Sequence, residues 1–454
     1  MRIAFYTLGC KVNQYETQAL EQIVTARGHL LVPFEGEADA YIINTCTVTA
    51  VSDKKSRQVI RRARKRAPDA VIAVCGCYPQ THPAELEGLS IDLVSGTGDR
   101  AGFVDLLERT WRERQPITAL DDALKRRAFE VLPAGGLEGR TRAMLKVEDG
   151  CVNFCTYCII PYARGPIRSL PLEKAKEQAA QLAAEGYQEL VLTGIEISSW
   201  GQERKDGTAL IDLVEGVCQA VPGCRVRLGS LEPRTVTREF CTRAARLDNL
   251  CPHFHLSMQS GCDATLKRMN RKYDTERFYE SVALLRDHFE DPAITTDMIV
   301  GFPGETEAEF GQTMDFIQRC AFSAMHIFPY SRRPGTPAAQ MAGQVPKAIK
   351  EERARRGAAV AAQMEREYLE RFVGRTLPVL FEEERDGLWR GHTTRYTEVA
   401  LQSGENLWRA ASCWGGRRSE KNVALEGRRC YNRSRCWAIM FRASRCPLRG
   451  ALHK

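Results

Sequence analysis

Apolar and polar positions in the first part of the chain alternate between short apolar runs and polar helical stretches. The apolar runs include "RIAFYTLG", "AYIINTC", "AVIAVCGC" and "IDLVSGTG". Between them lie stretches such as "QYETQALEQIVTARG", whose apolar residues recur at helical spacing. Strands that alternate with helices are typical of parallel sheets covered by helices. The pattern therefore predicts an open, parallel α/β domain over residues 1–125.

A second α/β series follows a linker, "DDALKRRAFEVLPAGGLEGRTR", which is marked by its Pro-Ala-Gly-Gly centre. The candidate strands are "RAMLKVEDG", "ELVLTGIEIS", "RVRLGSLEP", "HFHLSMQSG", "AITTDMIVGF" and "SAMHIFPYS". Strand and helix together repeat about every 30 residues, which is typical of a barrel-like parallel sheet. Residues 138–368 are thus predicted to form a partial (β/α)6 barrel. Its lateral opening would admit a large substrate.

The last region opens with a helix, "AIKEERARRGAAVAAQMEREYLERFVG", and continues with alternating strands and short turns. This pattern predicts a small antiparallel β domain over residues 369–430. From about Glu405 the periodicity ends, and the tail carries 12 Lys+Arg, three acidic residues and four cysteines without CxxC pairs. We therefore expect an incomplete β domain, and a shifted reading frame is one hypothesis for its tail. The four cysteines are Cys413, Cys430, Cys436 and Cys446.

Composition narrows the class of protein. The chain has 454 residues, 43% hydrophobic and 27% charged, which is typical of a soluble protein of two or three domains. The N-terminus lacks a signal-peptide pattern, and no apolar run is long enough to span a bilayer. These observations predict a cytoplasmic protein without membrane contact. Seventeen cysteines in a reducing compartment then indicate metal ligation, catalysis or core filling rather than disulfides.

The net charge of +8 is weak support for a polyanionic partner, and the clustering of basic residues along the chain is more informative. The segment "SDKKSRQVIRRARKRAPDA" is predicted to be a helix that Ser52 or Asp53 caps, with basic residues on most faces. Most such runs are solvated surface, and the alternative is contact with phosphates. A second basic stretch, "YSRRPGTP", follows the last barrel strand and is expected to add to the same basic surface.

Three cysteines of the N-terminal region each lie at the end of a predicted strand. Cys10, Cys46 and Cys77 follow successive apolar runs, at the sheet edge where α/β proteins place their sites. A single cysteine there is usually a small buried hydrophobe, whereas three indicate a site. Cys75 lies two residues before Cys77, and on an extended strand both side chains would share a face. The pattern alone leaves the choice between them open.

A second set of three cysteines, "CVNFCTYC", follows the first predicted barrel strand. Cys151, Cys155 and Cys158 have Cys-x3-Cys-x2-Cys spacing. Three thiolates can hold three irons of a 4Fe-4S cubane and leave the fourth iron open for chemistry. The alternatives are a structural zinc site and a four-cysteine cluster completed from afar. Both are weakened because the next cysteines, Cys218 and Cys224, lie in a predicted helix and its following loop.

The stretch "CVNFCTYCIIPYARGPIRS" resembles the radical S-adenosylmethionine enzymes, whose motif places an aromatic residue, here Tyr157, before the last cysteine. The stretches "TLGCKVNQYE", "INTCTVT" and "GCYPQ" narrow the resemblance to the methylthiotransferases, over about residues 1 to 400. The resemblance implies that Cys151, Cys155 and Cys158 ligate a 4Fe-4S cluster that binds S-adenosylmethionine. It implies a second 4Fe-4S cluster on Cys10, Cys46 and Cys77, and assigns Cys75 to core filling.

Within this family, "GCKVNQYE" resembles the type that transfers a methylthio group to C2 of N6-threonylcarbamoyladenosine in tRNA. The implied partners are the tRNA anticodon stem-loop, an electron donor such as flavodoxin or ferredoxin, and a sulfur donor. The C-terminal β domain then resembles a TRAM module. Alternative substrates are isopentenyladenosine in tRNA and a ribosomal protein. An alternative of another class is a non-enzymatic iron-sulfur or zinc protein that binds nucleic acid.

Further residues at the predicted barrel mouth are candidates for binding S-adenosylmethionine. Gly194 would allow close approach of the backbone to the methionine part. The polar groups of the ligand would be bound by Ser230, Gln259 and Asp297. Each polar side chain alone is equally typical of a residue that hydrogen-bonds to the backbone of its own loop. Only their common position after successive strands favours the binding role.

Overall fold

The computed structural model describes residues 1–135, 141–408 and 411–415. The chain forms two compact units, one of Met1–Met364 and a second that begins at Glu365. The first unit contains an N-terminal sheet and a partial barrel, and the second contains a small antiparallel sheet.

The N-terminal sheet has six parallel strands in the order β2-β1-β3-β4-β5-β6, as predicted for an open α/β domain. The strand order changes direction between β1 and β3, which makes this point of the sheet the natural crevice for a ligand. The strands are β1 (Arg2–Thr7), β2 (Leu30–Val32), β3 (Ala40–Thr45), β4 (Val71–Gly76), β5 (Leu93–Ser95) and β6 (Ile117–Ala119).

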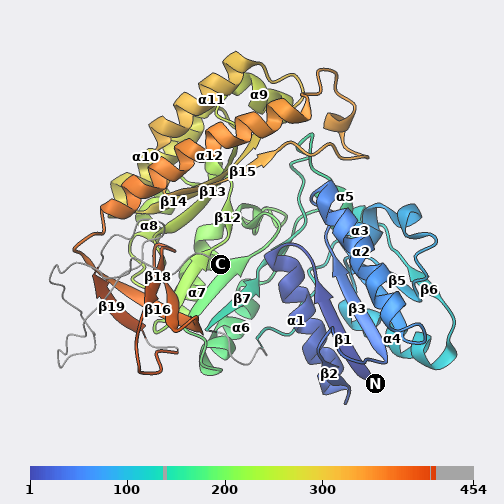
Figure 1. Ribbon diagram of the computed structural model, residues 1–454. Coiled ribbons are helices and arrows are strands. Elements are labelled where there is room, and N and C mark those ends of the chain that lie inside the picture. The colour runs from blue at the N-terminus through green and yellow to red at the C-terminus, as the bar shows by residue number, and fades with distance from the viewer. Residues whose placement is uncertain (136–140, 409–410, 416–454) are drawn as a thin grey trace, which may run out of the picture. The chain divides into compact units, whose positions relative to one another are not determined.

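Helices cover both faces of this sheet because the strands are apolar on both sides (Figure 1). The helices α1 (Lys11–Ala26) and α4 (Arg100–Glu113) pack on one face, with Leu20 and Phe103 in its core. The helix α2 (Ala50–Arg66) packs on the other face through residues such as Val59 and Ile60. A short helix, α3 (Cys77–Thr81), follows β4.

The basic helix α2 begins earlier than predicted. Its N-cap is Thr49, whose side chain accepts a hydrogen bond from the Ser52 backbone N–H at 3.2 Å, so neither Ser52 nor Asp53 is the cap. Asp53 is instead buried in the first turn and forms an ion pair with Arg333. The predicted cap was wrong because Thr49, three residues before Ser52, caps the helix, and Asp53 pairs instead with a residue far away in the sequence.

The barrel is built from parallel strands in two groups, β7-β10-β11 and β12-β13-β14-β15, which confirms the predicted partial (β/α)6 barrel. Its predicted third strand is divided at Gly229, whose N–H donates to Leu192 O at 2.8 Å. The strands are β7 (Arg142–Lys146), β10 (Glu189–Thr193), β11 (Arg225–Leu228), β12 (Ser230–Leu231), β13 (His253–Gln259), β14 (Ala293–Val300) and β15 (Ala324–Pro329). An additional two-stranded ribbon pairs β8 (Glu148–Asp149) with β9 (Arg168–Ser169).

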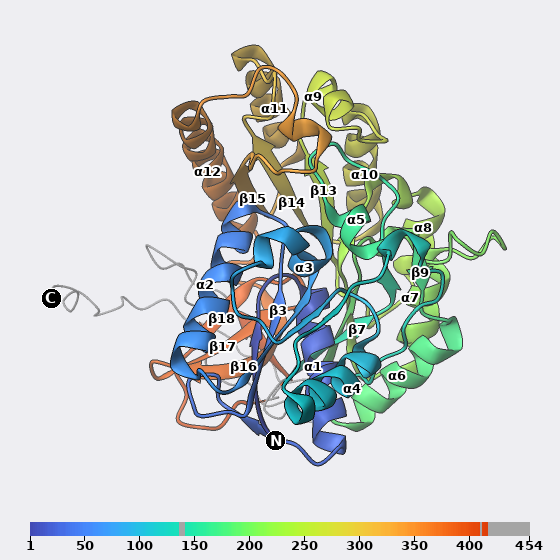
Figure 2. The ribbon, with the colours of Figure 1, turned by 90° about the vertical axis from the view of Figure 1, so that its right-hand side faces the viewer.

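Helices lie along the outside of the barrel strands (Figures 1 and 2). Alternate residues of β13 and β14, such as Phe254 and Ile294, pack under these helices, and the intervening residues are half-buried on the other face. The helices are α5 (Ile160–Arg164), α6 (Leu172–Ala184), α7 (Leu210–Ala220), α8 (Arg238–Ala244), α9 (Asp263–Arg268), α10 (Thr275–His288), α11 (Glu307–Cys320) and α12 (Lys347–Glu370). Single 3-10 turns are η1 (Pro83–Leu86), η2 (Ala123–Lys125), η3 (Ile197–Ser199), η4 (Pro233–Thr235) and η5 (Pro337–Ala339).

The core of the barrel also includes residues of α1 from the N-terminal sheet. Tyr15 and Ala19 are buried in the same apolar cluster as Leu145 of β7 and Leu190 of β10. The Tyr15 hydroxyl donates to Leu132 O at 3.0 Å. Helix α1 therefore contributes apolar residues to two cores, that of its own sheet and that of the barrel.

The second unit contains an antiparallel sheet in the order β18-β17-β16-β19, as predicted for the C-terminal region. The strands are β16 (Thr376–Arg385), β17 (Leu388–Thr393), β18 (Glu398–Leu401) and β19 (Ala411–Gly415). Val379, Phe381 and Trp389 lie in its apolar core. Most of the predicted aberrant tail, with Cys430, Cys436 and Cys446, lies outside the described residues, and only the backbone of Cys413 is described. In the described part, no helix has the length and apolarity to cross a membrane.

Candidate active site

The three N-terminal cysteines lie together at the carboxyl edge of the sheet. Cys10 precedes α1, Cys46 directly follows β3, and Cys77 opens α3 after β4. All three are free thiols. Burial is the main reason that the pKa of Cys77 is raised to about 12. The three loops follow the adjacent strands β1, β3 and β4, and a Cβ on Gly9 would lie 2.9 Å from the Cys46 Sγ. The cysteines therefore gather at the edge of the sheet where the strand order changes direction.

Cys75 has a different environment from Cys77. Its side chain is fully buried in the apolar core between the sheet and α4, in the same cluster as Val104 and Leu107. Burial raises the pKa of Cys75 to about 11. This location fits the core-filling role expected for Cys75.

A glycine with a left-handed backbone precedes three of the six cysteines. The φ angles are +109° at Gly9, +101° at Gly76 and +93° at Gly150. A Cβ atom on Gly9 would lie 2.6 Å from the Cβ of Cys46, and one on Gly150 would lie 2.0 Å from Pro166 O. Glycine is therefore required at both positions for the thiol loops to close.

The second set of cysteines occupies the loop between the β8 ribbon strand and α5. The Cys158 N–H donates to Cys155 O at 2.9 Å, and the Cys151 N–H donates to Gly165 O at 2.9 Å. Burial raises the pKa of Cys158 to about 12, and the nearby Cys155 thiol adds to the rise. Neighbouring backbone also holds the loop, since the Thr156 N–H donates to Met269 O at 3.0 Å. The three thiols thus form a compact group.

Arg271 contacts this loop although nothing in its spacing pointed to such a role. Its Nη1 donates to the Cys155 Sγ at 3.3 Å, and its Nη2 donates to Ser257 O at 3.1 Å on β13. A guanidinium beside a thiolate stabilises negative charge on the sulfur. Its sequence context, "KRMNRKY", is typical of an exposed loop, so only the structure identifies it.

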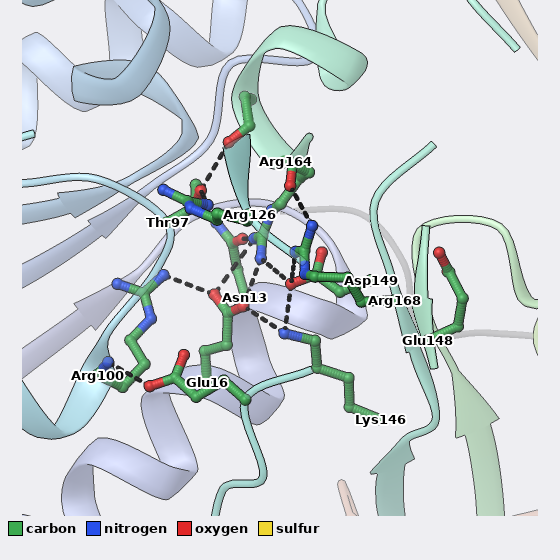
Figure 3. Close-up of polar contacts among 12 residues, drawn as sticks. Asn13, Glu16, Thr97, Arg100, Arg126, Lys146, Glu148, Asp149, Arg164 and Arg168 are labelled. Carbon is green, nitrogen blue, oxygen red and sulfur yellow. Dashed lines mark hydrogen bonds and ion pairs between the residues drawn. The ribbon is translucent and has the colours of Figure 1, made fainter. Parts of the chain in front are cut away.

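A buried ion network links the N-terminal sheet to the barrel (Figure 3). Glu16 of α1 pairs with Arg100 at 2.8 Å, with Lys146 at 2.9 Å, and with Arg164. Burial alone would raise the pKa of Glu16, but the three cations hold it well below its usual value. Asp149 extends the network, because its carboxylate also pairs with Lys146, at 2.8 Å.

The same network contacts both thiol loops. Arg164, which ends α5 after the Cys151–Cys158 loop, donates to Asn13 Oδ1 at 2.7 Å. The Asn13 amide donates to Leu8 O at 2.8 Å and to Thr45 O at 2.9 Å, which lie beside Cys10 and Cys46. Asn13 and Glu16 belong to "GCKVNQYE", so the sequence motif contained them, but their long-range partners were not predictable.

The candidate S-adenosylmethionine residues lie on the barrel strands and their ends. Gly194 directly follows β10, and a Cβ there would lie 2.7 Å from Glu148 Oε2. Ser230 opens β12 and is exposed. Gln259 ends β13 with a φ of +65°.

Asp297 and Tyr157 differ from this simple placement. Asp297 lies inside β14 rather than after it, on the half-buried face, with its Oδ2 3.4 Å from His255 Nε2. Tyr157 lies within the thiol loop, and its ring packs edge-on against Phe302 with centroids 6.3 Å apart. The sequence predicted that Gly194, Ser230, Gln259 and Asp297 share a position after successive strands. Asp297 departs from it because it lies within β14.

Two known families match the two regions of the chain that carry the thiol groups. Residues 145–317 match the Radical SAM superfamily, and residues 2–96 match the uncharacterized protein family UPF0004. A threonylcarbamoyladenosine tRNA methylthiotransferase MtaB of Bacillus subtilis is 43% identical over 412 residues, covering 89% of this chain and 91% of the relative. The chain belongs to the radical S-adenosylmethionine methylthiotransferases.

Other members of the methylthiotransferase family are more distant. A tRNA-2-methylthio-N(6)-dimethylallyladenosine synthase of Acetivibrio thermocellus is 33% identical, covering 88% of this chain and 85% of the relative. Among solved structures, the radical S-adenosylmethionine methyltransferase TsrM of Kitasatospora setae aligns with a TM-score of 0.54 and 17% identity, over 74% of this chain and 75% of that one. That likeness shows the fold alone.

The donor sets fit the clusters that radical methylthiotransferases use. Each set offers three free thiols, the ligands that iron-sulfur clusters prefer. In a cubane each thiolate binds a separate iron, so the sulfurs lie farther apart than the ligands of a single zinc. Within the described ranges, no group of three His, Cys, Asp or Glu side chains is arranged to hold one metal ion.

Proposed function

We propose that this chain transfers a methylthio group to C2 of N6-threonylcarbamoyladenosine in tRNA. The observation that carries the proposal is the pair of three-thiol groups within one compact unit, together with 43% identity to a threonylcarbamoyladenosine tRNA methylthiotransferase. Relatives of the same name from Thermotoga maritima and Aquifex aeolicus are 41% and 37% identical. The lower identity of the dimethylallyladenosine enzymes, 33% for that of A. thermocellus, favours threonylcarbamoyladenosine over isopentenyladenosine as the substrate.

The six cysteines are assigned to two 4Fe-4S clusters. Cys151, Cys155 and Cys158 would hold the cluster that supplies the electron for cleavage of S-adenosylmethionine, and Cys10, Cys46 and Cys77 would hold the cluster that supplies the sulfur. Cys46, Cys77 and Cys155 are buried, so their thiolates need cationic neighbours to hold their charge. Arg271 donates to Cys155, and the charge of Arg164 lowers the pKa of Cys77 against the larger effect of burial.

The remaining candidates are assigned to S-adenosylmethionine. The backbone of Gly194 would approach the methionine part of the ligand, and Tyr157 would lie beside it in the cluster loop. Glu148 already fills the space that a side chain at Gly194 would take. Gln259 and Asp297, on adjacent strands, would accept or donate hydrogen bonds to its polar groups. Ser230, exposed at the start of β12, would do the same.

The partner with the most support is the anticodon stem-loop of tRNA. Lys54, Lys55 and Arg61 are exposed on α2 and would contact phosphates. The antiparallel sheet of the second unit is the candidate TRAM-like domain. An electron donor such as flavodoxin or ferredoxin, a sulfur donor and a cytoplasmic location complete the proposal.

Anaerobic reconstitution tests the reaction. The protein should bind about eight irons, as expected for two 4Fe-4S clusters, and form 5′-deoxyadenosine from S-adenosylmethionine after reduction. Absence of 5′-deoxyadenosine would instead favour a non-enzymatic iron-sulfur or zinc protein. Nucleoside mass spectrometry of tRNA from a strain that lacks the gene tests the substrate. Loss of 2-methylthio-N6-threonylcarbamoyladenosine is expected. An unchanged level of this nucleoside, or loss of the isopentenyl product in its place, would reject the assignment.

A further inference from the structure

The segment 330–338, which runs from the end of β15 into η5, contacts both thiol loops. The Ala50 N–H, four residues after Cys46, donates to the Ser331 hydroxyl at 3.4 Å. At the other end of the segment, the Ala338 N–H donates to Thr156 O at 2.8 Å, within the Cys155–Cys158 loop. One short connection thus binds the two loops that the proposed function assigns to two clusters.

Arg333 lies at the centre of this segment, and it is buried rather than part of the predicted basic surface. Its side chain is 1% exposed. Its Nη2 donates to Asp53 Oδ2 at 2.9 Å and to the Thr47 hydroxyl oxygen. The Thr47 hydroxyl in turn donates to Asp53 Oδ1 at 2.9 Å. Because Thr47 directly follows Cys46, Arg333 is anchored beside the N-terminal thiol group.

The anchoring uses only one of the three nitrogens of the guanidinium. Nε and Nη1 of Arg333 are also buried, and neither has a hydrogen-bond partner within the described ranges. Buried charged donors without partners are costly, so such groups in a native protein usually bind something beyond the chain itself. The free donors therefore belong to a residue that is anchored beside Cys46, in a segment that also contacts the Cys155–Cys158 loop.

We propose that Arg333 is a positioning residue that holds the Cys46 loop against the Cys155–Cys158 loop, and that its Nε and Nη1 bind an anionic sulfur ligand of the N-terminal cluster. This inference rests on the proposed function. A sulfide or methanethiolate sulfur has the negative charge that two free guanidinium donors would stabilise.

Another buried arginine provides a matched control. Arg353 on α12 pairs with Glu305 at 2.7 Å, with 5% and 4% of the two side chains exposed. Its partners, Glu305 and Glu307, belong to the segment that follows β14 and to the start of α11. The variant R353Q therefore loses a buried ion pair of the same kind without loss of any contact to the Cys46 loop.

The test uses the full chain reconstituted anaerobically with both clusters. Three quantities are measured in wild type, R333Q, R333K and R353Q. They are bound iron, the ratio of methylthiolated nucleoside to 5′-deoxyadenosine, and the affinity for methanethiolate from its effect on the electron paramagnetic resonance spectrum. In R333Q we expect bound iron and 5′-deoxyadenosine formation near those of wild type, whereas the product ratio and the methanethiolate affinity fall about tenfold or more, as for lost charged hydrogen bonds.

The two other variants separate this role from general stabilisation. R333K keeps the positive charge without the planar guanidinium. Its product ratio and methanethiolate affinity should lie between those of R333Q and wild type. R353Q should keep the wild-type product ratio. An unchanged ratio or an unchanged methanethiolate affinity in R333Q overturns the inference. If R333Q fails to bind iron, the product ratio is measured in D53N, because this variant removes the anchor of Arg333 but keeps Arg333 itself. A wild-type ratio in D53N would also overturn the inference, whereas wild type without 5′-deoxyadenosine would reject the proposed function itself.

Discussion

Replacement of Glu16 by Gln should strongly destabilise the first unit. In the native network the Glu16 carboxylate, 1% exposed, faces Arg100, Lys146 and Arg164, which are 0%, 2% and 0% exposed. In the variant E16Q, Asp149 still pairs with Lys146 and Arg164, whereas Arg100 loses its ion pair with Glu16. Removal of one partner from a buried ion pair costs about 3–5 kcal/mol, because the remaining charge is neither solvated nor paired. Since Gln keeps the shape of Glu and some of its hydrogen bonds, we expect the free energy of unfolding to fall by about 3 kcal/mol, the lower end of this range.

Urea unfolding of the apoprotein, followed by circular dichroism, measures this loss as a change in the free energy of unfolding. The control is E177Q, because Glu177 pairs with Lys174 at 2.7 Å but is 65% exposed. An exposed pair contributes less than about 1 kcal/mol, so E177Q should unfold almost as wild type does. If E16Q were no less stable than E177Q, the network would not hold the sheet and barrel together, and the reasoning from burial would be refuted.

Three further predictions concern the same loops. The difference in free energy of unfolding between wild type and E16Q should shrink as pH falls below about 4.3, the pKa of Glu in the unfolded chain, because the pKa of Glu16 in the folded chain is lower still. A difference that stays constant from pH 7 to 3 would contradict this. G9A should lose about half of the bound iron, since a Cβ would lie 2.6 Å from that of Cys46, whereas G28A, with open space around it, should keep all of it. R271M should lower the midpoint potential of the radical cluster by about 60 mV, the one-electron equivalent of 1.4 kcal/mol, in a titration monitored by electron paramagnetic resonance; an unchanged potential would show that the Arg271 contact does not reach the cluster.

The sequence was sufficient for the layered architecture because period and length are local properties. The apolar runs of four to eight residues and the helical stretches between them predicted the parallel sheet, the six-part barrel and the antiparallel C-terminal strands. The same local reading placed Cys10, Cys46 and Cys77 at strand ends. It also predicted one continuous strand over "RVRLGSLEP", which Gly229 divides, because a single glycine does not alter the apolar pattern around it.

The residues that the sequence did not predict correctly have partners far along the chain. Asp53 resembled a helix cap and Arg333 a surface cation, yet they form a buried pair across 280 positions. Arg271 was not among the residues that the sequence singled out, although it donates to Cys155. A charged residue in a polar stretch normally predicts solvent exposure, and only the folded chain shows which charges are buried together.

Because Tyr15 and Ala19 of α1 pack in the barrel core, the N-terminal sheet and the barrel are not interchangeable parts. A chimera that joined the first hundred residues of one relative to the barrel of another would bring together two surfaces that had diverged separately. Substitutions at this shared helix must be matched on both sides, so the two halves of the first unit are expected to change in concert during evolution. Exchange of modules within the family should therefore succeed only when α1, β7 and α5 are transplanted together.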